Sequence, residues 1–194
     1  MRTVEQKIYK FHELTDTAKE RALDWMRETQ CESMPELLDW IIGEWKETLE
    51  HIGFLEPKVY YDISCSQGSG SCFDCRYVDL RKCLQYLDSK ESKKALRLRL
   101  DQYASASIKQ TLSSNYYCHE MTRYIDLDIH TTRHYRVEYL LNSLREDIEM
   151  LRLDLCLKIH RKLEQESDYY LSDECLIELI ECNDYEFTET GEVY

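Results

Sequence analysis

Two of the chain's five glycines lie two residues apart, in a short loop between two segments that both resemble β-strands. Lys58–Ser64 and Cys72–Asp79 are rich in Tyr, Val, Ile and Cys, and residues 67–70 join them. A glycine pair in such a connection indicates a positive φ or a close approach of the backbone to another group. The pattern therefore predicts a β-hairpin within an antiparallel sheet.

Helical and strand-like patterns precede this hairpin. Residues 3–11 end in an alternating, strand-like pattern, and Thr15 is a suitable N-cap for a first helix. Ser33 and Glu36 have the spacing of a capping box, which predicts that a second helix starts there. Gly53 follows the last apolar position of that helix and is expected to end it.

The remainder of the chain predicts both helices and strands. From Arg136 to Glu166, apolar residues recur at steps of four and three, which is typical of one long helix crossing a sheet. The other expected elements are a helix in one or two pieces over 80–104, a strand pair at 107–113 and 122–131, a helix at 172–181, and a last strand and turn at 185–194. We expect a single α+β domain over residues 1–194, with an antiparallel sheet of four or more strands packed on one side by helices.

The acidic residues are concentrated at the C-terminal end. Residues 164–194 contain eleven Asp or Glu and no Lys or Arg, so they carry −11 of the formal net charge of −13. Apolar residues such as Leu176 and Ile180 indicate that this region is folded. It should repel nucleic acids and anionic lipids and attract basic protein surfaces. The candidate partner-binding residues are Glu174, Glu178, Glu181, Asp184, Glu186 and Glu189.

Two loops are candidates for ligand binding. Successive backbone N–H groups near glycines can bind an anion, although a loop without Lys that joins two strands does not match a P-loop. An aromatic loop at 114–120 is expected to lie at the same edge of the sheet. The candidate ligand-binding residues are Ser66, Gln67, Gly68, Ser69, Gly70, Tyr116, Tyr117 and His119.

Three further patterns are weaker signals. The pair Cys72 and Cys75 has a ligand-like spacing, but no second pair follows and alternate strand faces would separate the two thiols, so no metal and no cofactor is expected. His119 and Glu120 could serve a hydrolytic enzyme, although adjacent residues rarely form a catalytic pair, and no catalytic residue is assigned. A basic stretch from Arg81 to Arg99 could contact phosphates but is more typical of a solvated helix face.

The cellular setting is predicted from what the sequence lacks. No run of about 18 apolar residues is present, so no transmembrane helix is expected. The N-terminal residues show no secretory signal, and nine cysteines are then expected to stay reduced. We therefore expect a cytoplasmic protein.

Four segments are distinctive in their order along the chain: Tyr9–Leu14 with Ala18–Ala22, Ser66–Phe73, Tyr116–His119 and Tyr185–Gly191. Together they resemble a family of small proteins of tailed bacteriophages, mostly of unknown function and some labelled antitoxin-like. The Ser-Gln-Gly-x-Gly core of the second segment is the most specific. The resemblance implies a phage origin and a role inside the infected bacterium, and it supplies no catalytic residue.

These observations predict a binding protein. The favoured hypothesis is a phage accessory protein whose acidic region neutralises a bacterial host protein, such as a defence effector, a nuclease or a toxin. One alternative is a sponge for a nucleotide signal at the two loops, and another is a hydrolytic enzyme. Direct binding to nucleic acid or to a membrane is not expected, and a homo-oligomer through the long helix is left open.

Overall fold

The computed structural model describes residues 6–64, 67–111, 117–130 and 135–194. They confirm the α+β class, the antiparallel sheet and the long helix in the C-terminal half. The chain groups into two compact units. Unit 1 comprises Met1–Asp39 and Glu164–Tyr194, and unit 2 comprises Trp40–Leu163. The single-domain boundaries 1–194 stay a prediction.

Unit 2 contains a five-stranded antiparallel sheet, in which β1 and β2 both pair with β3 and the order continues through β4 to β5. The strands are β1 (Phe54–Leu55), β2 (Lys58–Asp62), β3 (Gly70–Val78), β4 (Ala104–Gln110) and β5 (Arg123–Ile129). The β2–β3 hairpin and the β4–β5 pair confirm the two strand pairs that the sequence predicts. The β4 strand starts three residues earlier than expected.

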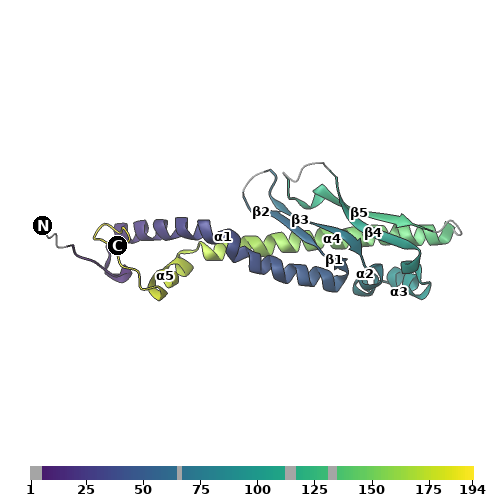
Figure 1. Ribbon diagram of the computed structural model, residues 1–194, viewed down its shortest axis with the longest axis horizontal. Helices are drawn as coiled ribbons and strands as arrows, with labels where there is room; N and C mark the ends of the chain where they lie inside the picture. The colour runs from purple at the N-terminus through teal and green to yellow at the C-terminus, as the bar shows by residue number, and fades with distance from the viewer. Residues whose placement is uncertain (1–5, 65–66, 112–116, 131–134) are drawn as a thin grey trace. The chain divides into compact units, whose positions relative to one another are not determined.

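One face of this sheet is apolar, because buried and more exposed residues alternate along the strands. In β4, Ala104, Ala106 and Ile108 are buried, and in β5 Ile125 and Leu127 are buried. The part of the helix α4 (Tyr135–Tyr170) that belongs to unit 2 runs alongside the sheet (Figure 1). Side chains of α4 bond directly to the β5 backbone, which fixes the helix against this strand.

Two short helices and a 3-10 turn connect β3 to β4. They are α2 (Leu80–Leu87), α3 (Lys90–Arg97) and η2 (Leu100–Gln102). The side chain of Asp79 caps α2 by accepting from the Lys82 N–H at 3.1 Å, and Ser89 caps α3 by accepting from the Ser92 N–H at 3.0 Å. The predicted helical segment therefore forms two pieces. A further 3-10 turn, η3 (Glu120–Thr122), leads into β5.

The first long helix, α1, is continuous from Asp16 to Ile52. The predicted break at Ser33 is wrong, because the Ser33 hydroxyl donates to the carbonyl of Thr29 at 3.3 Å and does not cap a new helix. Pro35 lies inside α1 and not in a first turn. Residues buried on both sides of Pro35, such as Met34 and Leu38, stabilise the helix despite the lost N–H donor.

Unit 1 has its own core, made by η1 (Phe11–Glu13), the first part of α1, and α5 (Asp173–Cys182) with the segment after it. Tyr9 and Phe187 exchange two backbone hydrogen bonds of 2.9 Å in an isolated antiparallel bridge. Within the described residues, the strands predicted at 3–11 and 185–194 are therefore reduced to isolated bridges. The buried core residues are Phe11, Leu14, Ala18, Ala22, Met26, Leu176, Ile180 and Phe187. The side chain of Ser172 accepts from the Cys175 N–H, which confirms it as the cap of α5.

Candidate functional site

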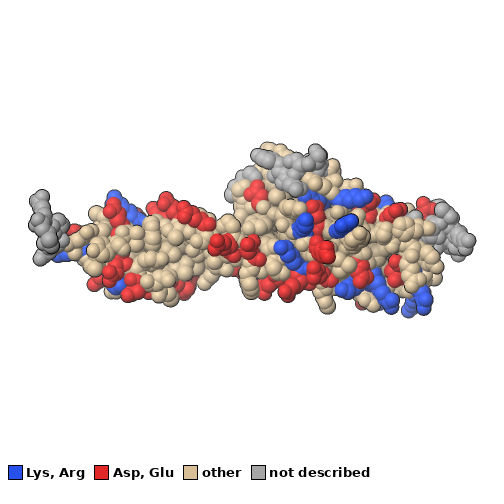
Figure 2. Space-filling model, viewed as in Figure 1, with Lys and Arg blue, Asp and Glu red and all other residues tan. Residues whose placement is uncertain are grey.

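The formal charge is divided very unequally between the two units. Unit 1 has six Lys or Arg against twenty Asp or Glu, a net charge of −14, whereas unit 2 has nineteen against eighteen, a net charge of +1. Figure 2 shows Asp and Glu along the visible face of unit 1 and Lys and Arg gathered over part of unit 2. The acidic surface therefore includes residues of α1 as well as the C-terminal residues that the sequence reasoning selected.

A row of carboxylates follows α1, with one at every fourth residue. We name it the acidic ridge, and its residues are Asp16, Glu20, Asp24, Glu28, Glu32 and Glu36, all exposed. A rise of 1.5 Å per residue separates neighbours by about 6 Å along the axis. The buried row that starts at Ala18 and Ala22 has the same repeat, offset by two residues and so by about 200° around the helix. The ridge thus stays opposite the buried side.

The predicted acidic residues of the C-terminal region fall into two groups. Glu174, Glu178, Glu181 and Glu189 are exposed and make no ion pair with any residue that the structure describes. Asp184 and Glu186 are paired with Lys10 of the same unit, whose Nζ lies 2.8 Å and 3.2 Å from their carboxylate oxygens. The hydrogen bond to Asp184 raises the pKa of Lys10, although burial acts in the opposite direction. These two carboxylates are therefore partly neutralised within unit 1.

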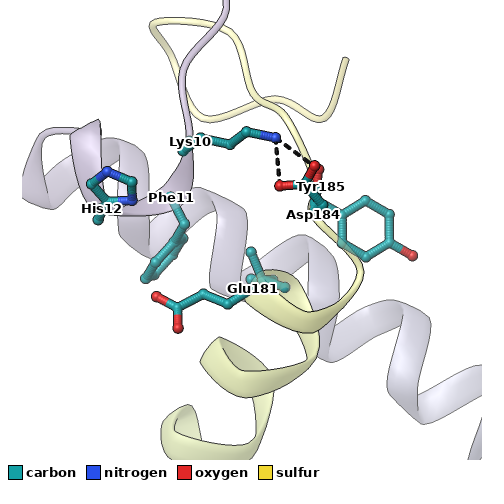
Figure 3. Close-up of a pocket in the computed structure, with 7 residues that line it drawn as sticks. Lys10, Phe11, His12, Glu181, Asp184 and Tyr185 are labelled. Carbon is teal, nitrogen blue, oxygen red and sulfur yellow. Dashed lines mark hydrogen bonds and ion pairs between the residues drawn. The ribbon is translucent and has the colours of Figure 1, made fainter.

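A hollow of about 240 Å³ opens between η1 and the C-terminal end of α5. It is lined by Lys10, Phe11, His12, Ile180, Glu181, Asp184 and Tyr185. Figure 3 shows Lys10 donating to the Asp184 carboxylate, and the Glu181 side chain extending from α5 toward Phe11. An aromatic ring beside a carboxylate without an ion pair suits a cationic side chain.

The two loops predicted to share one edge of the sheet are in direct contact in unit 2. The Cys118 N–H donates to the Gly68 carbonyl at 3.1 Å. Gly70 has φ +150°, and a Cβ at this residue would lie 2.6 Å from the His119 Cα. The glycine is therefore required by a close backbone approach and a positive φ together.

The individual loop residues have structural partners of their own. Ser69 donates to the Asp62 carbonyl at 2.8 Å, and the Tyr117 ring lies 6.2 Å from the His119 ring. Gln67 is exposed, and Ser66 and Tyr116 lie outside the described residues. The hollow between η1 and α5 is lined by other residues, so the proposed ligand site at these loops stays a prediction.

Two buried arginines, which the sequence reasoning missed, support this edge of the sheet. The Arg123 side chain is 0% exposed, pairs with Asp74 and lies 5.3 Å from the centroid of the Tyr60 ring. Arg152 of α4 is equally buried and donates to the Glu120 carbonyl at 2.9 Å and to Glu149 at 3.0 Å. Burying a guanidinium is costly unless it is paired, so these contacts rigidify η3 and the start of β5.

The cysteines of the described residues are free thiols. Burial raises the pKa of Cys75 to about 11 and those of Cys83 and Cys156 to about 12. Among the residues that the structure describes, no cluster of three His, Cys, Asp or Glu side chains is placed to hold a metal ion. No helix in the described ranges has an apolar stretch long enough to cross a bilayer.

The chain belongs to a family known as a domain of unknown function, DUF8835, whose model matches residues 38–173. No curated protein and no solved structure matches the chain. The family match covers all of unit 2. It leaves out the entire acidic ridge, and it stops at the first residue of α5.

Proposed function

We propose that unit 1 binds a basic surface of another protein and blocks it. The observation that carries this proposal is the charge division, with −14 on the 70 residues of unit 1 and +1 on unit 2. Such a surface creates a field that speeds the approach of a cationic partner and weakens as salt is added. The family resemblance in the sequence favours a bacterial target, such as a defence effector, a nuclease or a toxin.

The acidic ridge supplies the geometry of this interaction. Carboxylates about 6 Å apart along the axis of α1, each turned about 40° from the one before, form a row of negative charge that winds slowly around the helix, and the phosphates of a nucleic acid also follow a helical path. A groove built to hold phosphates therefore offers complementary charges to the ridge. The hollow beside Glu181 would receive one Lys or Arg side chain of the same partner.

A matched pair of variants tests the role of the ridge. In the first variant Glu20, Glu28 and Glu36 are changed to Gln, and in the control Glu44, Glu47 and Glu50 are changed to Gln. Both triples are exposed residues of α1 with the same charge change, but the control residues belong to unit 2. Each variant and the wild type is used to capture proteins from bacterial lysate at 50 mM NaCl, followed by elution at 500 mM.

The proposal requires a protein that the wild type and the control retain at low salt and that the ridge variant loses. With this protein purified, the ridge variant should show about ten-fold weaker binding, mostly through the association rate. Binding that is unchanged by salt, or equally weak in both variants, would rule the mechanism out. Capture of a second copy of the chain alone would show self-association in place of inhibition.

A further inference from the structure

Unit 2 contains a polar hollow of about 300 Å³ that the proposed function does not use. We name it the arginine hollow. Its lining residues are Arg81, Gln85, Leu96, Arg99, Asp101 and Gln102. They come from α2, the end of α3, and the η2 turn, so one short connection between β3 and β4 builds the whole site.

The local fold brings the two arginines to one place. Arg81 and Gln85 are one helical turn apart on α2 and therefore share a face. Arg99 lies between α3 and η2 with φ 54° and ψ 39°, a left-handed conformation that non-glycine residues seldom adopt. Its N–H donates to the Leu96 carbonyl and its carbonyl accepts from the Gln102 N–H, both at 3.1 Å. A tight turn thus holds Arg99 at the rim of the hollow despite the backbone strain.

The hollow has an excess of positive charge. Arg81 and Arg99 are exposed and form no ion pair with any residue in the described ranges. Among the six lining residues Asp101 supplies the one carboxylate. Residues 81–99 carry seven Lys or Arg against two acidic residues. One of these two, Asp88, forms an ion pair with Lys93, with 2.9 Å between Oδ1 and Nζ. Two guanidinium groups around one hollow repel each other unless an anion lies between them.

We propose that the arginine hollow binds the phosphate group of a small phosphorylated ligand. Guanidinium groups match phosphate oxygens through paired N–H donors, and the amides of Gln85 and Gln102 can add neutral hydrogen bonds. A volume of about 300 Å³ lies at the small end of ligand pockets and suits a phosphate or diphosphate.

Binding to the full-length chain can be measured by calorimetry with three probes: inorganic pyrophosphate, ATP, and a single-stranded oligonucleotide without terminal phosphates. Arg81→Gln and Arg99→Gln each remove one guanidinium from the hollow. Lys94→Gln is the matched control, because Lys94 is exposed in the same basic stretch and does not line the hollow. Each arginine variant should weaken pyrophosphate binding about ten-fold, and the control less than about two-fold.

Two further variants separate binding from folding and geometry from charge. Arg99→Gly removes the guanidinium but accepts the left-handed backbone, so it should lose binding while its melting temperature is kept or raised. Arg81→Lys keeps the charge and loses the planar fork, so it should also bind more weakly. ATP bound at least as tightly as pyrophosphate would identify a nucleotide as the natural source of the phosphate.

Three results would overturn the proposal. The first is no binding of pyrophosphate or ATP to the wild type at millimolar concentration. The second is an equal loss in Lys94→Gln and the arginine variants, which would indicate diffuse attraction and no defined site. The third is binding of the oligonucleotide without binding of pyrophosphate, which would indicate a nucleic acid surface spread over α2 and α3.

Discussion

The contact between the two loops of unit 2 can be tested by adding one methyl group. Gly70→Ala would place a Cβ 2.6 Å from the His119 Cα and 2.9 Å from the His119 Cβ. Carbon atoms that are not bonded to each other do not approach this closely, so one of the two loops must move. The move would also strain the hydrogen bond from Cys118 to Gly68, which joins the loops two residues away.

The size of the effect follows from two contributions. Holding a non-glycine residue at φ +150° costs on the order of 1–3 kcal/mol. Forcing a methyl group into a packed position costs about another 1–3 kcal/mol. Partial relaxation of the loops offsets some of this sum, so we expect Gly70→Ala to lower the free energy of unfolding by about 2–5 kcal/mol.

Gly43→Ala is a matched control for the same chemical change. Gly43 lies inside α1, and a Cβ at this position would meet no heavy atom within 4 Å. Alanine is a better helix former than glycine, so this variant should gain about 1 kcal/mol. Urea unfolding followed by circular dichroism gives both values, provided that the m-value stays constant. A Gly70→Ala protein as stable as the wild type would refute the loop contact.

Two further predictions concern the helix and the thiols. Pro35→Ala should stabilise the protein by about 2 kcal/mol, because α1 is continuous through this residue; no gain in thermal unfolding would instead favour a helix that starts near it. At pH 8 Ellman's reagent should label the exposed Cys31 and Cys182 in the native protein, whereas Cys83 and Cys156 should react only after unfolding. Since burial raises the pKa of those two thiols to about 12 from the ordinary 9.0, the native state keeps their protons while the unfolded state loses them. The urea midpoint of unfolding should therefore fall as the pH rises above about 9. A midpoint that does not change with pH in this range would contradict the burial of Cys83 and Cys156.

Local sequence signals were sufficient for most of the fold. The glycine pair and the β-branched and aromatic residues on either side of it predicted the β2–β3 hairpin. Ser172 predicted the start of α5. Both predictions succeeded because turns and caps depend mainly on neighbouring residues. The same kind of signal failed at Ser33, where a capping pattern lies inside a helix. Burial along α1 outweighs a local preference there, and burial cannot be computed from a capping motif.

The functional surfaces were less accessible to sequence reasoning. The four-residue repeat of the acidic ridge is visible in the sequence, but it forms one surface only because α1 is unbroken at Ser33, where the sequence predicted a second helix. Arg123 could not be assigned, because a single arginine at the start of a strand resembles a surface residue until Asp74 is brought beside it from another strand. Arg81 and Arg99 are likewise 18 residues apart, and only the packing of α2, α3 and η2 makes them line one hollow.

The limits of the family match bear on how the two proposals relate to each other. The matched residues 38–173 include the arginine hollow and the loop contact, whereas the acidic ridge lies entirely before residue 38. A property common to the family is therefore to be sought in unit 2, and partner capture by the ridge would be an addition carried by flanking residues. If so, the two activities can be separated: the ridge variant should bind pyrophosphate like the wild type, and Arg81→Gln should keep the captured protein. Joint loss of both activities in either variant would show instead that the ridge and the hollow serve one site.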